Sequence, residues 1–412
     1  MEVDRRTMLG AAALPLIGAA LPAKVLAGDW EAIARQYDVT RKVVQLEHGN
    51  WGMMARPVLA AYHAMNERVN RETSYYARRT MVGDLEAVRG KVAAALGVQA
   101  DEIALTRNAT EAMKALILQY NRLKPGDAVI YADLDYDSMQ GSMEALAARR
   151  GVNLIRIALP EPASYQGVID AYEAAFKTIP WVRMVLLTHA SHRTGLVLPV
   201  AEITRLAESR GIDVLVDAAH SVGQLDFKLP DLKAPFIGLN LHKWFGAPLG
   251  VGAIYIRKDR LDAIDPDPAE DPKNIAITAK VHTGTPGYAA QLTVPAALEF
   301  QAAIGAGRRE ARLKALRDRW VRPLRDLPQV QIMTPDDPRM YGAITSFRLR
   351  GRTSHDDNVA LAKALLDKHR IFSVHRDGLA SGSCVRITPA LATRMEDLDA
   401  LVAAIRDLAR KV

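Results

Sequence analysis

Lys243 is the residue whose surroundings point most directly to chemistry. It follows an apolar run at 235–239 that is typical of a strand, and it precedes a loop rich in Gly and Pro at 246–250. A lysine between such a strand and such a loop is poorly placed to be a solvated surface residue. Its amine is therefore a candidate for covalent or proton-transfer chemistry.

Asp217 is the second candidate, since it ends the apolar strand predicted at 212–217. An electron-sink cofactor works when its pyridine nitrogen is protonated, and a buried carboxylate beside that nitrogen keeps the proton in place. We therefore hypothesise that Lys243 carries pyridoxal phosphate as an imine and that Asp217 holds the ring nitrogen protonated. His220 could hydrogen-bond the phenolic oxygen. The alternative is that Asp217 only caps a helix or a turn. The lysine that follows the next strand counts against this alternative.

Two further stretches could hold such a cofactor. A strand at 103–106 leads to a helix that starts near Thr110, and a helix N-terminus offers unpaired N–H groups to a phosphate. Thr110 could instead be a simple N-cap. Tyr136 follows the strand at 128–133, at the strand ends where open α/β sheets bind ligands. It is placed either to stack on a flat ring or to pack at the rim of the core.

The candidates for substrate contact are polar loop residues and one arginine in a strand. His48 and Asn50 lie in a Gly/Asn turn that could line a site or be a plain turn, and His192 lies in a loop rich in polar donors. Arg386 lies in an apolar strand, where an arginine is costly unless it is paired. A ligand carboxylate and a structural salt bridge both explain it.

The elements that must position these residues alternate between helices and short apolar strands from about Leu85. This alternation predicts an α/β domain with a mainly parallel sheet. A long helical stretch, 289–320, broken near 305–307, leads to a small α+β domain, with strands expected at 330–333, 343–348, 372–374 and 385–388 and helices at 355–368 and 395–408. The predicted units are a signal at 1–27, an N-terminal segment at 28–55 packing on the small domain and the site, a large domain at 56–305 and a small domain at 306–412.

The composition is that of a globular protein, with 49% hydrophobic and 25% charged residues among 412. The net charge of +7 does not indicate nucleic-acid binding, because the basic residues are spread along the chain and form no long run. The single cysteine, Cys384, excludes an intrachain disulfide and a cysteine-based metal cluster. No metal site is expected.

The first residues are similar to a signal peptide of the twin-arginine class. Arg5 and Arg6 precede an apolar run from Ala11 to Leu21, and small residues follow up to Ala27, where cleavage is plausible. A short N-terminal helix with chance arginines is the alternative. We expect export to the periplasm by the twin-arginine machinery with the cofactor already bound. No membrane span is expected, because no segment is long and apolar enough.

Together the motifs resemble the class V aminotransferases of fold type I, in the branch that includes isopenicillin N epimerase-like proteins. The resemblance runs from about Gln45 to the C-terminus. Its most specific parts are the stretches 191–195, 216–223, 240–244 and 284–286. It implies a large domain with a mainly parallel sheet of the seven-stranded type, a small C-terminal α+β domain, and pyridoxal phosphate as the cofactor.

The resemblance also implies roles for single residues. The catalytic residues would be Lys243, which forms the imine and moves the proton, Asp217 at the ring nitrogen and His220 near the phenolic oxygen. Tyr136 would cover the ring. The phosphate would be held by Ala109, Thr110, Asn240 and His242. Thr285 would reach the phosphate of the neighbouring subunit, which implies a homodimer with shared sites. Substrate contacts would come from His48, Asn50, His192 and Arg386, with Arg386 on the α-carboxylate.

Two departures from the family pattern bear on the reaction. The segment 375–383 contains no cysteine, whereas persulfide-forming desulfurases need a thiol there, so cysteine desulfuration is not expected. His192 and Arg193 stand where relatives often carry Asn or Pro. The expected activity is transamination or epimerisation of an amino acid or an amino-acid-derived substrate, such as a peptide or a siderophore precursor. The alternatives are a β-eliminating C–S lyase and a non-catalytic ligand-binding scaffold, and intact Lys243 and Asp217 count against the scaffold.

Overall fold

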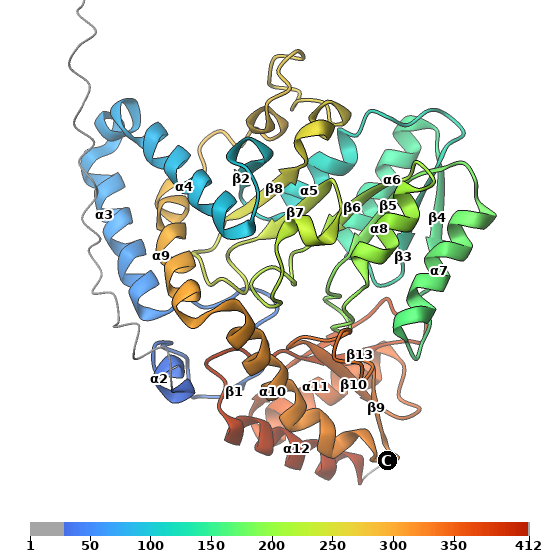
Figure 1. The fold of residues 1–412 in the computed structure, drawn as a ribbon. Coiled ribbons are helices and arrows are strands. Elements are labelled where there is room, and N and C mark those ends of the chain that lie inside the picture. Colours follow the sequence, from blue (N-terminus) through green and yellow to red (C-terminus); the bar gives the residue numbers. More distant parts are fainter. Residues whose placement is uncertain (1–28, 411–412) are drawn as a thin grey trace, which may run out of the picture.

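The computed structural model describes residues 29–410, so the signal predicted at 1–27 lies outside the described range. Seven strands form the central sheet: β2 (Ile103–Thr106), β3 (Ala128–Ala132), β4 (Asn153–Ile157), β5 (Val182–Thr188), β6 (Asp213–Asp217), β7 (Phe236–Asn240) and β8 (Gly252–Ile256). Their order is β2-β8-β7-β6-β5-β3-β4 (Figure 1). Strand β8 runs antiparallel to the other six strands of this sheet, which are parallel to one another. The predicted mainly parallel sheet is thereby confirmed.

Helices cover both faces of this sheet. They are α4 (Met81–Leu96), α5 (Ala109–Leu118), α6 (Asp137–Arg150), α7 (Tyr165–Thr178), α8 (Val200–Glu208) and α9 (Tyr288–Ile304). Helix α3 (Arg56–Arg79) packs outside them, on α4 and α9 (Figure 1). Successive side chains of a strand point to opposite faces. In β6, Val214 and Val216 join the core shared with α4, α7, α8 and α9, whereas Leu215 joins the core shared with α5 and α6.

The edge strand β4 has no counterpart among the sequence-based expectations. Its residues Asn153 and Arg156 are exposed and the rest are half-buried. One face of this edge strand is exposed to solvent. Its sequence therefore lacks the continuous apolar run that is typical of the buried strands. By contrast β3, β6 and β7, which are almost wholly buried, begin and end within a residue or two of their predicted bounds.

The C-terminal part has its own antiparallel sheet, with the order β12-β13-β10-β9. Its strands are β9 (Val330–Ile332), β10 (Thr345–Leu349), β12 (Val374–Arg376) and β13 (Cys384–Ile387), and its helices are α10 (Ala306–Arg325), α11 (His355–His369) and α12 (Met395–Ala409). The predicted break between the long helices is confirmed at Gly305, whose φ of 88° ends α9. The single strand predicted at 372–374 is wrong. There are two strands, because the chain leaves β11 (Ile371–Phe372) and enters β12 in a different sheet.

The segment that precedes α3 connects the two parts of the molecule. After the short helix α2 (Trp30–Ala34), strand β1 (Val44–Gln45) pairs in parallel with β11. Glu47 then bridges Thr388, and the Gly52 N–H donates to the His242 carbonyl over 2.9 Å. Residues 44–52 are therefore held between the C-terminal part and the loop that carries Lys243. No helix within residues 29–410 has the length and apolar character needed to cross a membrane.

Candidate active site

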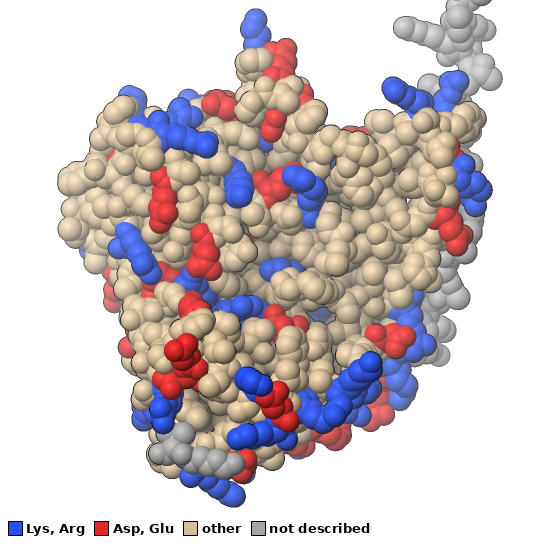
Figure 2. Space-filling model, turned by 180° about the vertical axis from the view of Figure 1, so that it is seen from behind, with Lys and Arg blue, Asp and Glu red and all other residues tan. Residues whose placement is uncertain are grey.

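A cavity of about 660 Å³ opens at the carboxyl ends of the central strands. Strands β5, β6 and β7 contribute their last residues, Thr188, Asp217 and Asn240, and the first residues of α5 line the same space. Arg386 and the segment 375–378 close it from the C-terminal part. Figure 2 shows a hollow between the two parts of the molecule, with basic side chains visible inside it. Strand ends of this kind are where open α/β sheets bind their ligands.

Lys243 and His220 meet in this cavity. The Lys243 Nζ lies 2.9 Å from Nε2 of His220. Burial lowers the pKa of Lys243 to about 8, and the charge of Arg386 acts in the same direction, while the charges of Asp217 and Glu47 oppose it. Burial and the charge of Lys243 also hold the pKa of His220 well below its usual range. The amine is therefore partly neutral near pH 7, and the neutral imidazole can accept its hydrogen bond.

Asp217 presents a carboxylate that is almost without access to water. It is 5% exposed and accepts a hydrogen bond of 2.9 Å from the Ala219 N–H. Burial raises the pKa of Asp217, and both the Ala219 N–H and the charge of Lys243 counteract this. A cation placed against the carboxylate would favour its ionised form further. The residue thus has the properties expected of the partner of a pyridinium nitrogen.

Asp135 is a second buried carboxylate of this region, and it was not among the sequence-based candidates. It is 1% exposed, and its Oδ2 accepts from the Ala132 N–H over 2.7 Å. Burial raises the pKa of Asp135 to about 7, and the charge of Asp217 contributes to the rise. An acidic residue directly after a buried strand and a turn is the only sequence signal that could have identified it.

The N-terminus of α5 is organised differently from the sequence-based expectation. The N-cap is Asn108, whose Oδ1 accepts from the Glu111 N–H over 2.9 Å, so Thr110 is not the cap. The Ala109 N–H donates to Asn240 Oδ1 over 2.8 Å. Ala109 and Asn240 line the cavity, but this N–H and this side-chain oxygen are already hydrogen-bonded to each other. Thr110, the second residue of the helix, keeps an N–H without a helical partner and a hydroxyl for a phosphate.

His242 and a close backbone contact complete this end of the cavity. The His242 Nδ1 donates to the Val251 carbonyl over 2.8 Å, which leaves Nε2 available. Burial lowers the pKa of His242, so its ring is neutral near pH 7. A Cβ at Gly252 would lie 2.7 Å from the Asn108 carbonyl carbon. The absence of a side chain there lets α5 approach β7 and β8 and brings Thr110 to the same cavity as His242.

Arg386, which the resemblance places on a substrate α-carboxylate, already has protein partners in the structure. It is 1% exposed, pairs with Glu47 at 2.5 Å and donates to the His192 carbonyl over 2.7 Å. Burial lowers its pKa to about 10 even though Glu47 opposes the shift. Arg376 lies 3.7 Å from the same Glu47 oxygen. The structural salt bridge weighed from the sequence is therefore present, and a substrate carboxylate has to share Arg386 with Glu47.

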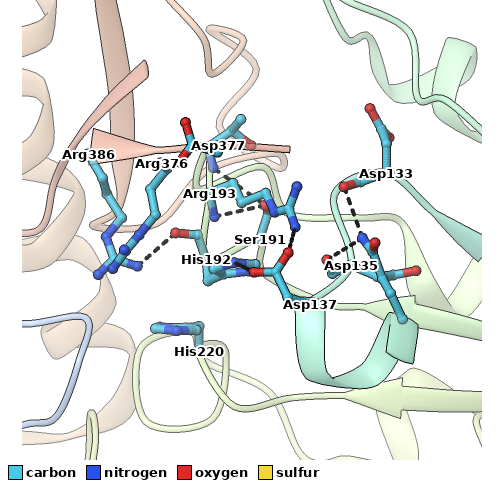
Figure 3. A network of polar contacts seen from close by, with 12 residues as sticks. Asp133, Asp135, Asp137, Ser191, His192, Arg193, His220, Arg376, Asp377 and Arg386 are labelled. Atoms are coloured by element: carbon cyan, nitrogen blue, oxygen red, sulfur yellow. Dashed lines mark hydrogen bonds and ion pairs between the residues drawn. The ribbon is translucent and has the colours of Figure 1, made fainter. Parts of the chain in front are cut away.

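Figure 3 shows the side chains of Arg376 and Arg386 extending from the C-terminal strands toward the loop with His192. Two guanidinium groups thus face one carboxylate, which leaves one positive charge unbalanced among these three residues. Neither Glu47 nor Arg376 was a sequence-based candidate. Glu47 could have been considered from the sequence, because neighbouring side chains of an extended segment point to opposite sides. Glu47 and His48 could therefore not both face the site, and Glu47 was the alternative to His48.

His48 does not line the main cavity, although Lys243 lines both that cavity and the smaller one that His48 lines. It is buried, burial lowers its pKa to about 4, and it lines a separate cavity of about 30 Å³ that is too small for a substrate. Asn50, the other candidate of that turn, does line the main cavity. Thr285 is exposed and does not line it, so its predicted contact with a neighbouring subunit stays a prediction.

His192 and Tyr136 lie at the cavity as predicted from the sequence. Their rings meet edge to face, with centroids 5.1 Å apart, and Tyr136 is 38% exposed. Burial keeps the pKa of His192 well below its usual range. The adjacent Arg193 is 2% exposed and pairs with Asp137, which lines the cavity (Figure 3).

These features fit pyridoxal phosphate. Thr110 supplies unpaired donors for a phosphate, Asp217 supplies the buried carboxylate, and Lys243 supplies an amine of lowered pKa. The Nδ1 atoms of His192 and His220 are buried and have no hydrogen-bond partner among the described residues. Orphaned buried polar atoms are rare in proteins, and a bound polar ligand resolves them. The cavity volume also lies within the range of small-molecule sites.

The chain is similar to known proteins along most of its length. Residues 55–401 match the family model for class V aminotransferases. The chain is 29% identical over 394 residues to an isopenicillin N epimerase from Streptomyces clavuligerus, with 92% of this chain and 98% of that protein covered. It is 33% identical over 217 residues to a probable chloroplastic L-cysteine desulfhydrase from Arabidopsis thaliana, with 48% and 46% covered. The apo structure of a cysteine desulfurase from Thermococcus onnurineus NA1 has the same fold, with a TM-score of 0.80 at 22% identity and 93% and 98% covered. The chain belongs to the class V aminotransferase family, and its cofactor is pyridoxal phosphate.

Proposed function

We propose that this protein acts on the amino group of a substrate that also bears a carboxylate, by transamination or epimerisation. The observation that carries the proposal is the 2.9 Å contact between Lys243 Nζ and His220 Nε2 in a cavity that also presents Asp217. Pyridoxal phosphate, when bound there, supplies a protonated ring that takes up the electrons left when a proton leaves the substrate carbon. Lys243 takes that proton at Nζ and returns it.

The surplus positive charge at Arg376 and Arg386 supports a carboxylate on the substrate. Glu47 balances one of the two guanidinium groups, and an incoming carboxylate would balance the other. Gly49 contributes by leaving room, since a Cβ there would lie 2.6 Å from Nη2 of Arg386. The substrate carboxylate is therefore expected beside Gly49, within reach of both arginines.

The two reaction types differ in where the proton returns. Transamination returns it to the cofactor, whereas epimerisation returns it to the substrate carbon from the opposite side. The likeness to isopenicillin N epimerase, over nearly the whole chain, supports epimerisation. His192 and Tyr136, which line the cavity on loops other than that of Lys243, are the side chains that could supply a proton from a second direction.

A β-elimination of the C–S lyase type is the second candidate, because the likeness to plant L-cysteine desulfhydrases favours it. Elimination needs a base and an electron sink but no protein thiol. Persulfide transfer does need a thiol, and Cys384 is fully buried, where burial raises its pKa to about 12. Such a cysteine forms no thiolate at neutral pH and is closed to a substrate.

Export and dimerisation remain part of the proposal. The twin-arginine motif at Arg5 and Arg6 supports delivery of the folded, cofactor-loaded protein to the periplasm. The exposed position of Thr285 supports a contact with a second copy of the chain. Cell fractionation of the full chain and of an R5K/R6K variant would test export, and sedimentation of the purified protein would test the dimer.

The reaction is tested by exchange of the substrate Cα hydrogen in D₂O. Purified holoenzyme is incubated with a panel of L- and D-amino acids and short peptides, and deuterium incorporation is measured by mass spectrometry. Chiral chromatography, ketoacid detection and sulfide detection then separate epimerisation, transamination and elimination. Exchange that depends on Lys243 is expected, with Lys243→Ala as the control. Absence of exchange across the panel, in a protein that shows the visible cofactor band, would overturn the proposal in favour of a ligand-binding scaffold.

A further inference from the structure

A cluster of metal-ligating side chains lies at the rim of the cavity. Within residues 29–410, His355, His375 and Asp377 form the one group of three such residues whose ligand atoms all lie within 4.8 Å of one another. His375 and Asp377 line the active-site cavity, and His355 is the first residue of α11. We infer that these three residues bind a divalent transition-metal ion of the zinc class at the mouth of the active site.

The distances match those between ligands that share an ion. His355 Nδ1 lies 3.1 Å from one Asp377 oxygen, and His375 Nε2 lies 3.6 Å from that same oxygen. Nitrogen and oxygen ligands at roughly 2.0–2.2 Å from Zn²⁺ in a tetrahedral arrangement are about 3.3–3.6 Å apart. The two imidazole rings meet edge to face, with centroids 4.9 Å apart and planes at 87°. One nitrogen of each ring and a carboxylate oxygen of Asp377 all lie within 4.8 Å of one another.

The carboxylate is held in place by a second residue. Ser383 Oγ donates to the other oxygen, Oδ1 of Asp377, over 2.6 Å. Hydrogen bonds of this kind commonly fix the ligands of a metal site. His375 and Asp377 are two residues apart along an extended segment and share a side, whereas Arg376 between them turns toward Glu47. Residues 375–377 therefore alternate between the proposed metal site, with His375 and Asp377, and the pair with Glu47, with Arg376.

Two imidazole nitrogens and one carboxylate oxygen are a donor set that suits Zn²⁺ and its neighbours more than Mg²⁺ or Ca²⁺. Three protein ligands leave at least one coordination position for water or a ligand. Because two of the three residues line the cavity, that position is reachable from the cavity. The ion would place a positive charge at the entrance used by the substrate. This inference is independent of the reaction type proposed above.

The test is zinc binding to the tag-free holoenzyme, measured by competition with a chromophoric chelator. His375→Gln and Asp377→Asn should each weaken the affinity for Zn²⁺ by more than about 100-fold, and Ser383→Ala by about 10-fold. His282 offers a matched control, because it pairs with Glu270 over 2.8 Å but belongs to no group of three such residues within 29–410. His282→Gln should leave the affinity unchanged.

A result in which wild type and the His375→Gln, Asp377→Asn double variant bind zinc equally would overturn the inference. So would a wild-type protein that retains no stoichiometric zinc. The visible cofactor band and the melting temperature of each variant show whether it has folded and loaded its cofactor. Cα hydrogen exchange tests the proposed function separately. Failure of zinc binding would therefore leave the proposed function unaffected, and absence of hydrogen exchange would leave the inferred metal site unaffected.

Discussion

The lowered pKa of Lys243 predicts how the apoprotein takes up its cofactor. Only the neutral amine attacks the cofactor aldehyde, and the pKa of Lys243 is lowered from 10.5 to about 8, first by burial. At pH 7 about one tenth of the amine is neutral, compared with roughly one in 3,000 for an ordinary lysine, so attachment gains about 300-fold from the environment. The rate of attachment should rise tenfold per pH unit at low pH and level off near pH 8.

Two substitutions should move this midpoint in opposite directions. The charge of Glu47 raises the pKa of Lys243, so Glu47→Gln should shift the midpoint below 8. The charge of Arg376 lowers it, so Arg376→Gln should shift the midpoint above 8. Both residues lie outside the predicted contacts to the phosphate and the ring, so each variant should still bind the cofactor.

The assay mixes apoprotein with pyridoxal phosphate from pH 6 to pH 9.5 and follows growth of the visible absorption band. The same cofactor with a simple primary amine gives the reference for ionisation of the cofactor itself. Lys243→Ala supplies the blank. A midpoint above 9.5, or a shift of the two variants in the same direction, would refute the reasoning that burial and these charges set the pKa of Lys243.

Three further predictions concern stability and substrate binding. Burial lowers the pKa of His189 from 6.5 to about 4, so the unfolded chain binds an extra proton between these values and stability falls as pH drops from 6.5 to 4. In urea titrations, His189→Gln should make that fall shallower by about 1.4 kcal/mol per pH unit, and an unchanged slope would contradict it. Gly49→Ala should displace Arg386 and raise KM for a carboxylate substrate about 10- to 100-fold, whereas Gly83→Ala, which meets no atom within 4 Å, should not. Asn108→Ala removes the cap of α5 and should cost about 1 kcal/mol, measured by thermal unfolding, and equal melting temperatures would exclude that role.

The parts of the fold predicted well from sequence are those where burial leaves a simple pattern. Strands β6 and β7 are buried on both faces, so their continuous apolar runs predicted the strands and also placed Asp217 and Lys243 at neighbouring ends. The edge strand β4 lacks that pattern and was missed. The division of 371–376 into β11 and β12 was missed because it depends on which partner strand each half meets.

The site residues that could be predicted from the sequence are those for which a single residue type meets a single chemical requirement. A carboxylate or a lysine after a buried strand is conspicuous, whereas the Ala109 contact to Asn240 depends on the approach of α5 to β7. The Glu47 pair with Arg386 joins residues far apart in sequence. Local patterns predict which elements a segment forms, but such pairings depend on the packing of the whole chain.

The charges at the substrate end of the cavity also connect recognition to proton transfer. Arg376 and Arg386 lower the pKa of Lys243, while Glu47 and Asp217 raise it. On the proposed function, a substrate carboxylate that binds to the arginines adds a negative charge near Lys243 and offsets their effect. The pKa of the freed amine then rises when a substrate with a carboxylate is in place, so the amine becomes a stronger base at the moment it must take the substrate proton. An amine that lacks a carboxylate would not produce this change, and selection for carboxylate-bearing substrates would therefore act on the rate of proton removal as well as on binding.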